Sequence, residues 1–282
     1  MVSIIIPSCN EKFLKNTLDD IFNKATGRIE VIVGHDEYNS DANTHIDTRV
    51  VNIFFPKRIG MRALTNHLAK NATGEYIMKC DAHCAFGKGF DEILASSCQD
   101  NWIVVPRQYP LSVDTWDRNK RKKHVDYWYL IAPDESKEAS RTNGLAPYRW
   151  YARKNANLID DLMTFQGSCW LMTTTHFKNL GYLDGTNYGY FGFEACELSL
   201  KTWLSGGRVV VNKNTWYAHL HKGRKHGRMY FLSKSALHKS AKYNLDLWMN
   251  NKWDRAIHDT KWLIDKFSPV PTWDNFNWSK EW

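Results

Sequence analysis

Asp81 and His83 are the residues of this chain whose types and spacing most clearly suggest chemistry. They stand two positions apart in the stretch YIMKCDAHCAF (residues 76–86), shortly after the apolar run Tyr76-Ile77-Met78. A carboxylate and an imidazole at the end of a buried strand can hold a hard divalent cation such as Mn²⁺ or Mg²⁺. Such an ion keeps positions open for phosphate oxygens, so it can offset the charge on a departing diphosphate.

Two other interpretations of this stretch are open. Cys80, His83 and Cys84 could belong to a zinc site, although no fourth ligand stands at ordinary spacing and Cys80 would still lie in the strand. Alternatively, the polar residues simply end a strand. The helices and strands predicted around these side chains help to decide among the three interpretations.

The first hundred residues alternate between strand and helix patterns. Apolar runs predict strands at 2–7, 30–34, 75–80 and 102–106. Apolar residues at helical spacing predict helices at 11–25, 61–74 and 90–94. This alternation is typical of an α/β fold with a mainly parallel central sheet flanked by helices. Ligands bind outside the carboxyl ends of such strands, where residues 7–11, 35–36 and 81–83 fall.

The pattern is interrupted after residue 106 and then returns. Residues 107–157 include DRNKRKKHVDYWYL and predict a long insertion or flexible loop that could act as a lid. Regular elements are predicted again at 163–177, 194–204, 208–211 and 230–266. We therefore predict a domain at 1–229 with an insertion at 107–162, followed by a helical, Trp-rich C-terminal extension at 230–282.

Several motifs, in their order along the chain, resemble those of one enzyme family. VSIIIPSCNE (2–11) is similar to the first strand and turn of family-two-type glycosyltransferases of the GT-A fold, and DAHC (81–84) resembles the Asp-x-His motif of the polypeptide N-acetylgalactosaminyltransferases. The segments similar to later parts of that catalytic domain are QGSCWLMTTTHFKNLGYLDG, YFGFEACELSLKTWLSGGRVVV and TWYAHLHKG. The resemblance covers residues 2–105 and 163–225. It implies a GT-A fold and transfer of a sugar from a UDP-linked donor to an acceptor hydroxyl.

The resemblance implies a role for each matching residue. The residues implied to bind the nucleotide-sugar are Pro7, Ser8, Asn10, Asp36, Arg58, Asp81, Ala82, His83, Phe191 and Lys222. The implied ligands of Mn²⁺ or Mg²⁺ are Asp81, His83 and His219. Phe191 takes the place of a Trp over the leaving group, and Lys222 matches an Arg that contacts the diphosphate.

Glu194 and Glu197 match the two acids of the family's Trp-Gly-Gly-Glu block and are the candidate catalytic carboxylates. In an inverting enzyme one of them would take the acceptor's proton. The resembled family instead uses front-face attack, with the leaving phosphate as proton acceptor, which implies retention. Two positions depart from the family's pattern: His35 stands where the first of two Asp is usual, and Ala195 replaces an Asn.

Several of these residues have a second interpretation. Glu194 could simply stabilise the N-terminus of a helix, and Glu197 could form a surface ion pair with Lys201. Arg58 could be a solvated charge.

The third metal ligand also has two candidates. His221 lies two residues beyond His219 and could take its place. His219 could equally be a core histidine.

The charge of the chain suggests what the acceptor is. The formal net charge is +8, which favours a polyanionic partner. The basic runs at 118–123 and 222–228, with Tyr127-Trp128-Tyr129 between them, suit phosphates and extruded bases. We therefore predict DNA carrying a hydroxymethylated pyrimidine as acceptor. A surface glycan and a protein side chain are alternatives, and so is a non-catalytic nucleic-acid-binding module with a degenerate sugar site.

The cellular location is predicted from what the sequence lacks. No apolar run approaches the roughly 18 residues of a membrane span, and we find no signal-peptide pattern. None of the six cysteines forms a Cys-x-x-Cys pair, so we expect free thiols and a cytoplasmic protein.

Overall fold

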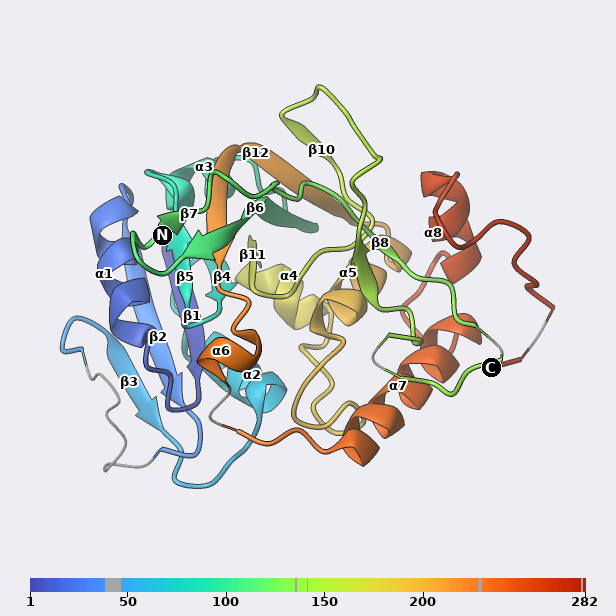
Figure 1. Cartoon of the computed structure of the whole chain (residues 1–282), viewed down its shortest axis with the longest axis horizontal. Coiled ribbons are helices and arrows are strands. Elements are labelled where there is room, and N and C mark those ends of the chain that lie inside the picture. The colour runs from blue at the N-terminus through green and yellow to red at the C-terminus, as the bar shows by residue number, and fades with distance from the viewer. Residues whose placement is uncertain (39–46, 135, 141, 228–229, 280) are drawn as a thin grey trace.

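The computed structural model of the chain describes residues 1–38, 47–134, 136–140, 142–227, 230–279 and 281–282. The strands of the main sheet are β1 (Val2–Ser8), β2 (Ile29–His35), β3 (Val51–Phe54), β4 (Tyr76–Cys80), β5 (Cys84–Phe86), β6 (Trp102–Ser112), β7 (Asp117–Arg118), β10 (Ile159–Asp161), β11 (Cys169–Thr173) and β12 (Arg208–His219). Their order across the sheet is β10-β12-β6-β11-β4-β1-β2-β3, with β5 paired to β12 and β7 to β6. Figure 1 shows helices packed around this sheet.

Parallel pairing brings the ends of three strands to one edge. β1 pairs in parallel with both β2 and β4, so Ser8 lies beside His35 and the chain leaves β4 next to them. β11 runs antiparallel between β4 and β6. The polar residues that follow β1, β2 and β4 therefore meet, as the predicted α/β arrangement requires.

The helices form where apolar residues recur on one face. They are α1 (Leu14–Lys24), α2 (Met61–Asn71), α3 (Phe90–Ser96), α4 (Thr174–Asn179), α5 (Glu194–Leu204), α6 (Gly223–His226), α7 (Lys234–Met249) and α8 (Thr260–Phe267). In α1 the buried positions Leu14, Leu18 and Ile21 lie on one face. No helix of the described ranges is long and apolar enough to cross a membrane.

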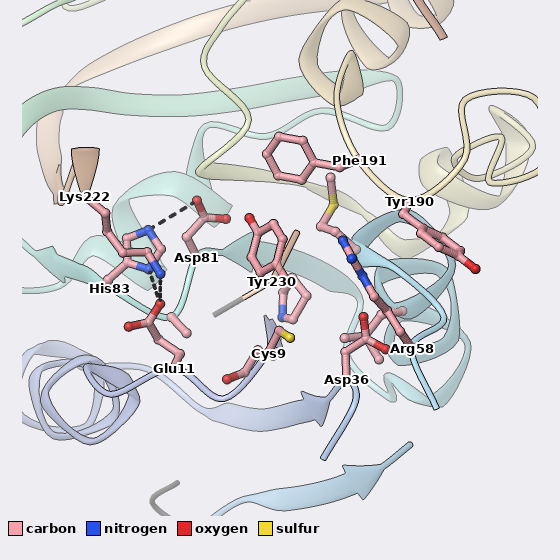
Figure 2. A pocket seen from close by; sticks show the side chains of 15 residues that line it. Cys9, Glu11, Asp36, Arg58, Asp81, His83, Tyr190, Phe191, Lys222 and Tyr230 are labelled. Carbon is pink, nitrogen blue, oxygen red and sulfur yellow. Dashed lines mark hydrogen bonds and ion pairs between the residues drawn. The ribbon is translucent and has the colours of Figure 1, made fainter. Parts of the chain in front are cut away.

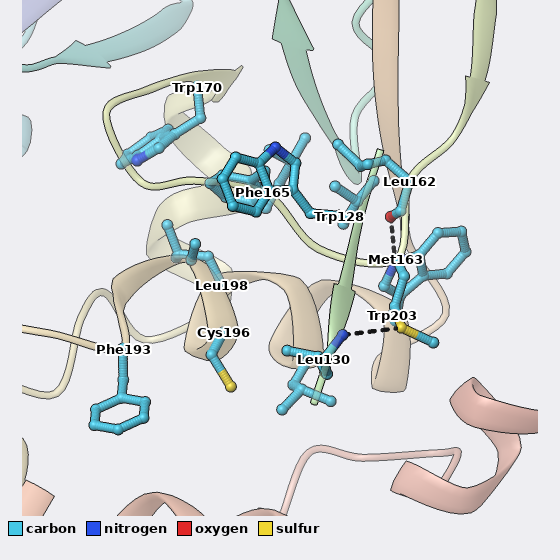
Figure 3. Close-up of a cluster of buried hydrophobic side chains, with 14 of the residues drawn as sticks. Trp128, Leu130, Leu162, Met163, Phe165, Trp170, Phe193, Cys196, Leu198 and Trp203 are labelled. Carbon is cyan, nitrogen blue, oxygen red and sulfur yellow. Dashed lines mark hydrogen bonds between the residues drawn. The ribbon is translucent and has the colours of Figure 1, made fainter. Parts of the chain in front are cut away.

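The region predicted as a loop is more regular than its sequence suggests. β6 continues to Ser112, and β8 (Trp128–Leu130) pairs with β9 (Pro147–Arg149) in a separate two-stranded sheet. Trp128 and Leu130 are buried in the same apolar cluster as Phe165 and Trp203 (Figure 3). Short strands of this kind are fixed by burial against distant residues, which local sequence does not show.

The predicted helix at 230–266 is two helices, because residues 250–259 leave the helical path between α7 and α8. Asp259 starts α8 by accepting a hydrogen bond from the backbone N–H of Trp262. Trp248 of α7 and Leu263 of α8 belong to the cluster that also holds Trp203 of α5. The core thus continues across residue 230, and the proposed domain boundary there stays a prediction.

Candidate functional site

A pocket opens where β1, β2 and β4 end (Figure 2). The residues lining it are Pro7, Ser8, Cys9, Glu11, Asp36, Arg58, Met61, Leu64, Asp81, Ala82, His83, Tyr190, Phe191, Lys222 and Tyr230. These include every residue implied to bind the nucleotide-sugar except Asn10. The Asn10 amide donates a hydrogen bond to the Glu37 carbonyl at 3.1 Å.

Asp81 and His83, which line this pocket, form a cluster with His219. Their ligand atoms all lie within 4.8 Å of one another, and they form the only such cluster found among the described residues. Asp81 Oδ2 is 3.1 Å from His219 Nε2 and 3.9 Å from His83 Nε2. The rings of His219 and His221 are 4.8 Å apart, but His221 is not part of the cluster. The geometry thus favours His219 as the third ligand.

The charges around this cluster suit a cation. Burial on its own would raise the pKa of Asp81, but the Lys79 ammonium and the His219 ring lower it below its usual value. Burial lowers the pKa of His219, which keeps the imidazole neutral and able to donate its lone pair to a metal. Cys80 and Cys84 are fully buried, in β4 and β5, and belong to no metal-binding cluster in the described part of the chain. The zinc alternative therefore has no support.

Glu11 links the metal cluster to Lys222. Its carboxylate lies 3.1 Å from His83 Nδ1 and also pairs with the Lys222 ammonium. Burial would raise the pKa of Glu11, but His83 and Lys222 outweigh it and lower the pKa. A carboxylate on the second ring nitrogen of a ligating histidine fixes the ring's orientation and tautomer. The ion pair between Glu11 and Lys222 also holds the Lys222 side chain in the lining of the pocket.

The opposite side of the pocket is built around Asp36 and Arg58 (Figure 2). Asp36 accepts hydrogen bonds from the backbone N–H groups of Ile59 and Gly60 at 2.7 and 3.0 Å. Gly60 has φ +85°, and a Cβ there would stand 2.7 Å from Tyr190, so the turn requires glycine. The Arg58 guanidinium lies over the Tyr190 ring and donates to the backbone carbonyl of Phe231. Arg58 is therefore held at the pocket rather than simply solvated.

A second pocket adjoins the first. The two share Met61, Asp81 and Phe191. The other residues lining the second pocket include Lys79, Trp128, Tyr148, Phe165, Gln166, Gly167, Phe193 and Glu194. A group bound in the second pocket would lie beside Asp81, which lines both pockets. We call this the acceptor pocket and the first the donor pocket, after the roles that we propose for them below.

Glu194 stands in the acceptor pocket at the first position of α5. Its carboxylate accepts a hydrogen bond from Trp170 Nε1 at 2.7 Å and lies 3.3 Å from the Lys79 ammonium. Lys79 also lies 2.7 Å from Asp81 Oδ1. Burial would lower the pKa of Lys79, but the two carboxylates outweigh it and raise the pKa, so Lys79 stays charged. Glu194 thus has specific partners, and a helix-end role alone does not account for it.

Glu197 lies elsewhere. Its side chain is fully buried, pairs with Arg62, and lies 2.7 Å from the Lys201 ammonium. It also accepts the backbone N–H of Asp184 at 2.9 Å. The predicted pair with Lys201 is present, but it is buried rather than on the surface. Glu197 lines neither pocket, and its buried ion pairs favour a structural role.

Two residues of this site had no role in the sequence-based prediction. Glu11 closes the motif VSIIIPSCNE, and Lys79 interrupts the apolar run of β4. A charged residue inside a buried strand is the one available signal, since lysine is almost never buried without a partner.

Comparison with known proteins places this arrangement in a family. The sequence pattern of glycosyl transferase family 2 matches residues 3–181, more than half of the chain. The chain belongs to glycosyl transferase family 2. The family 2 chain is 26% identical over 271 residues to the probable polypeptide N-acetylgalactosaminyltransferase 8 of Homo sapiens, covering 88% of this chain and 40% of the relative. It is 28% identical over 177 residues to the probable N-acetylgalactosaminyltransferase 8 of Caenorhabditis elegans, covering 60% and 39%. The chain thus spans less than half the length of these relatives.

Solved structures confirm the predicted GT-A fold. The crystal structure of GalNAc-T7 with UDP, GalNAc and Mn²⁺ superposes with a TM-score of 0.68 at 17% identity, covering 89% of this family 2 chain and 48% of that one. S. aureus TarS 1–349 in complex with UDP-GlcNAc gives 0.55 at 14% identity, covering 93% and 69%. At these identities the likeness concerns the fold.

Proposed function

We propose that this family 2 chain is a metal-dependent glycosyltransferase that moves a sugar from a UDP-linked donor to an acceptor hydroxyl. The observation that carries the proposal is the cluster of Asp81, His83 and His219, in which Asp81 lines both the donor and the acceptor pocket. Support for a UDP-sugar comes from the relatives, which are named N-acetylgalactosaminyltransferases, and from the GalNAc-T7 structure with UDP and Mn²⁺.

The donor set fits Mn²⁺ or Mg²⁺. One carboxylate and two imidazoles converge, and the buried Nδ1 of His219 has no hydrogen-bond partner among the described residues. When bound there, the ion supplies positive charge to the diphosphate that leaves. Lys222 and Arg58, at opposite sides of the donor pocket, supply further positive charge to it. Phe191, at the wall shared by the two pockets, packs over the leaving group.

Glu194 acts on the acceptor side. Its two oxygens are engaged by Trp170 and Lys79, so the carboxyl group is fixed in place. Burial outweighs both partners and raises the pKa of Glu194 above its usual value. We propose that it orients the sugar or the acceptor hydroxyl by accepting a hydrogen bond. The acceptor's proton then passes to the leaving phosphate, and the configuration is retained, as the resemblance to the N-acetylgalactosaminyltransferases implies.

The acceptor is proposed to be DNA with a hydroxymethylated pyrimidine. The aromatic side chains of Trp128, Tyr148 and Phe165 line the acceptor pocket, and flat rings suit a base turned out of the helix. The net charge of +8 favours a polyanion. A surface glycan or a protein side chain remains the alternative acceptor.

The experiment measures UDP release from a panel of UDP-sugars with Mn²⁺ and with EDTA. Each donor is offered with hydroxymethylated DNA, oligosaccharides and peptides. We expect release that needs the metal and rises with one acceptor class. A chain that binds DNA but turns over no UDP-sugar would be a binding module, and the proposal would be wrong.

A further inference from the structure

A third pocket lies beside the metal cluster, beyond the end of β12. Lys122 and Lys123 line it from the segment after β7, Arg149 from the end of β9, and His221 from the residues after β12. Tyr109 and Tyr151 complete its aromatic wall. Segments far apart in sequence thus bring three cations to one hollow.

The charge of this pocket is unbalanced. Its described lining contains no carboxylate, and Lys122, Lys123 and Arg149 are exposed. Within the described ranges none of the three forms an ion pair with an acid. The nearest acid in sequence, Asp126, is held by Arg107 at 2.6 Å. Lys123 lies over the Tyr151 ring and Arg149 over the Trp128 ring, with their charged groups 4.7 and 5.8 Å from the ring centres.

The pocket neighbours the proposed reaction site at two points. His221, in its wall, has its ring 4.8 Å from that of the metal-cluster residue His219. Strand β9 contributes Tyr148 to the acceptor pocket and the next residue, Arg149, to the cationic pocket. Strand β9 therefore supplies neighbouring residues to both pockets.

We propose that the cationic pocket binds a backbone phosphate of a DNA acceptor, next to the nucleotide whose base enters the acceptor pocket. This inference rests on the proposed function. A guanidinium and two ammonium groups are the donors that a phosphodiester attracts, and Arg can contact two of its oxygens at once. A phosphate site beside an aromatic site matches the repeat of base and phosphate in a nucleic acid better than it matches a neutral glycan.

The surface run at 118–123 offers a matched control. Lys120 and Arg121 are exposed and carry the same charge as Lys122 and Lys123, but they do not line the pocket. K122Q/K123Q and K120Q/R121Q therefore remove equal charge from one segment. The single variant R149Q removes the one cation that β9 contributes to the pocket.

Binding to a short fluorescein-labelled duplex with one hydroxymethyluracil is followed by anisotropy from about 50 to 200 mM salt. We expect K122Q/K123Q and R149Q each to weaken binding about tenfold. Each should flatten the log–log salt slope by about 0.9, the value for one lost phosphate contact. K120Q/R121Q should stay near wild type. Equal losses in the two double variants would overturn the inference, because net charge alone would then explain them.

A second measurement separates this inference from the proposed function. UDP release from the UDP-sugar in the absence of acceptor should be the same in wild type and K122Q/K123Q. If wild type releases no UDP from any UDP-sugar with any of the acceptors, the proposed function itself is rejected. If both double variants bind the duplex like wild type, and K122Q/K123Q loses only transfer to an oligosaccharide, the phosphate inference is overturned and the pocket holds a glycan.

Discussion

Replacing Glu197 by Gln should lower the free energy of unfolding of the protein while leaving its rate of sugar transfer largely intact. Glu197 neutralises Arg62, and both side chains are fully buried. Arg62 also donates to the carbonyls of Asp184 and Gly192 at 3.0 and 2.6 Å, so the pair anchors the loop that carries Phe191.

The size of the effect follows from what the substitution leaves behind. Burial and the neighbouring Arg62 lower the pKa of Lys201 to about 7, so Lys201 can lose its proton in the variant. A guanidinium cannot, and Arg62 would remain as a buried charge without a counter-ion. Removing one partner of such a pair costs about 3–5 kcal/mol. At about 2 °C for each kcal/mol in a chain of this size, Tm should fall by roughly 6–10 °C.

The assay combines urea denaturation with single-turnover kinetics at a temperature where E197Q is folded. E194Q, on the first turn of the same helix, is the comparison, since Lys79 keeps Asp81 as a partner in that variant. We expect E197Q to lose stability and keep a rate within about tenfold of wild type. Unchanged stability with a rate lowered a hundredfold or more would refute the structural role and restore Glu197 as a catalytic residue.

Three further predictions follow from the site and the core. E194Q should slow transfer far more than it weakens UDP-sugar binding, because Glu194 lies in the acceptor pocket; a collapse of donor affinity measured by calorimetry would assign it to the donor side instead. H83A should abolish Mn²⁺-dependent UDP release with little change in Tm, and full turnover would remove His83 from the metal site. Burial lowers the pKa of His176 to about 4, against 6.5 for the unfolded chain. The neutral His176 ring therefore contributes its full stability above pH 6.5, and this stability is lost as the pH falls towards 4, because only the unfolded chain takes up the proton readily. Between pH 7 and 4.5 the free energy of unfolding of wild type, measured by urea titration, should fall by about 2–3 kcal/mol more than that of H176Q. Equal losses would show that His176 does not titrate in this way.

The parts of the fold predicted from sequence are those set by local pattern. The helix at Glu194–Leu204 and the strands at β1, β2 and β4 follow from apolar spacing, and Asp81 and His83 follow directly from their place after β4. The resemblance to known transferases then supplied His219, which lies 138 residues beyond Asp81 in sequence.

Other features depend on contacts that no local pattern contains. Glu11 meets His83 and Lys222 across 72 and 211 residues of sequence, so its role appears only once the chain is folded. The strands β8 and β9 lie in a basic, irregular stretch and form because Trp128 and Leu130 find apolar partners elsewhere. Within the run at 118–123, the sequence does not show that Lys122 and Lys123 line a pocket while Lys120 and Arg121 do not; only the folded structure shows this difference.

The central claim is that Asp81, His83 and His219 form a metal site that serves the donor. The most direct test is a titration of Mn²⁺ in the presence of UDP, followed by electron paramagnetic resonance, on wild type, H219A and H221A. We predict that wild type and H221A each bind one Mn²⁺ more tightly with UDP than without it, and that H219A loses this site. Wild-type protein that binds no Mn²⁺ with UDP, or H219A that binds it as wild type does, would contradict the account.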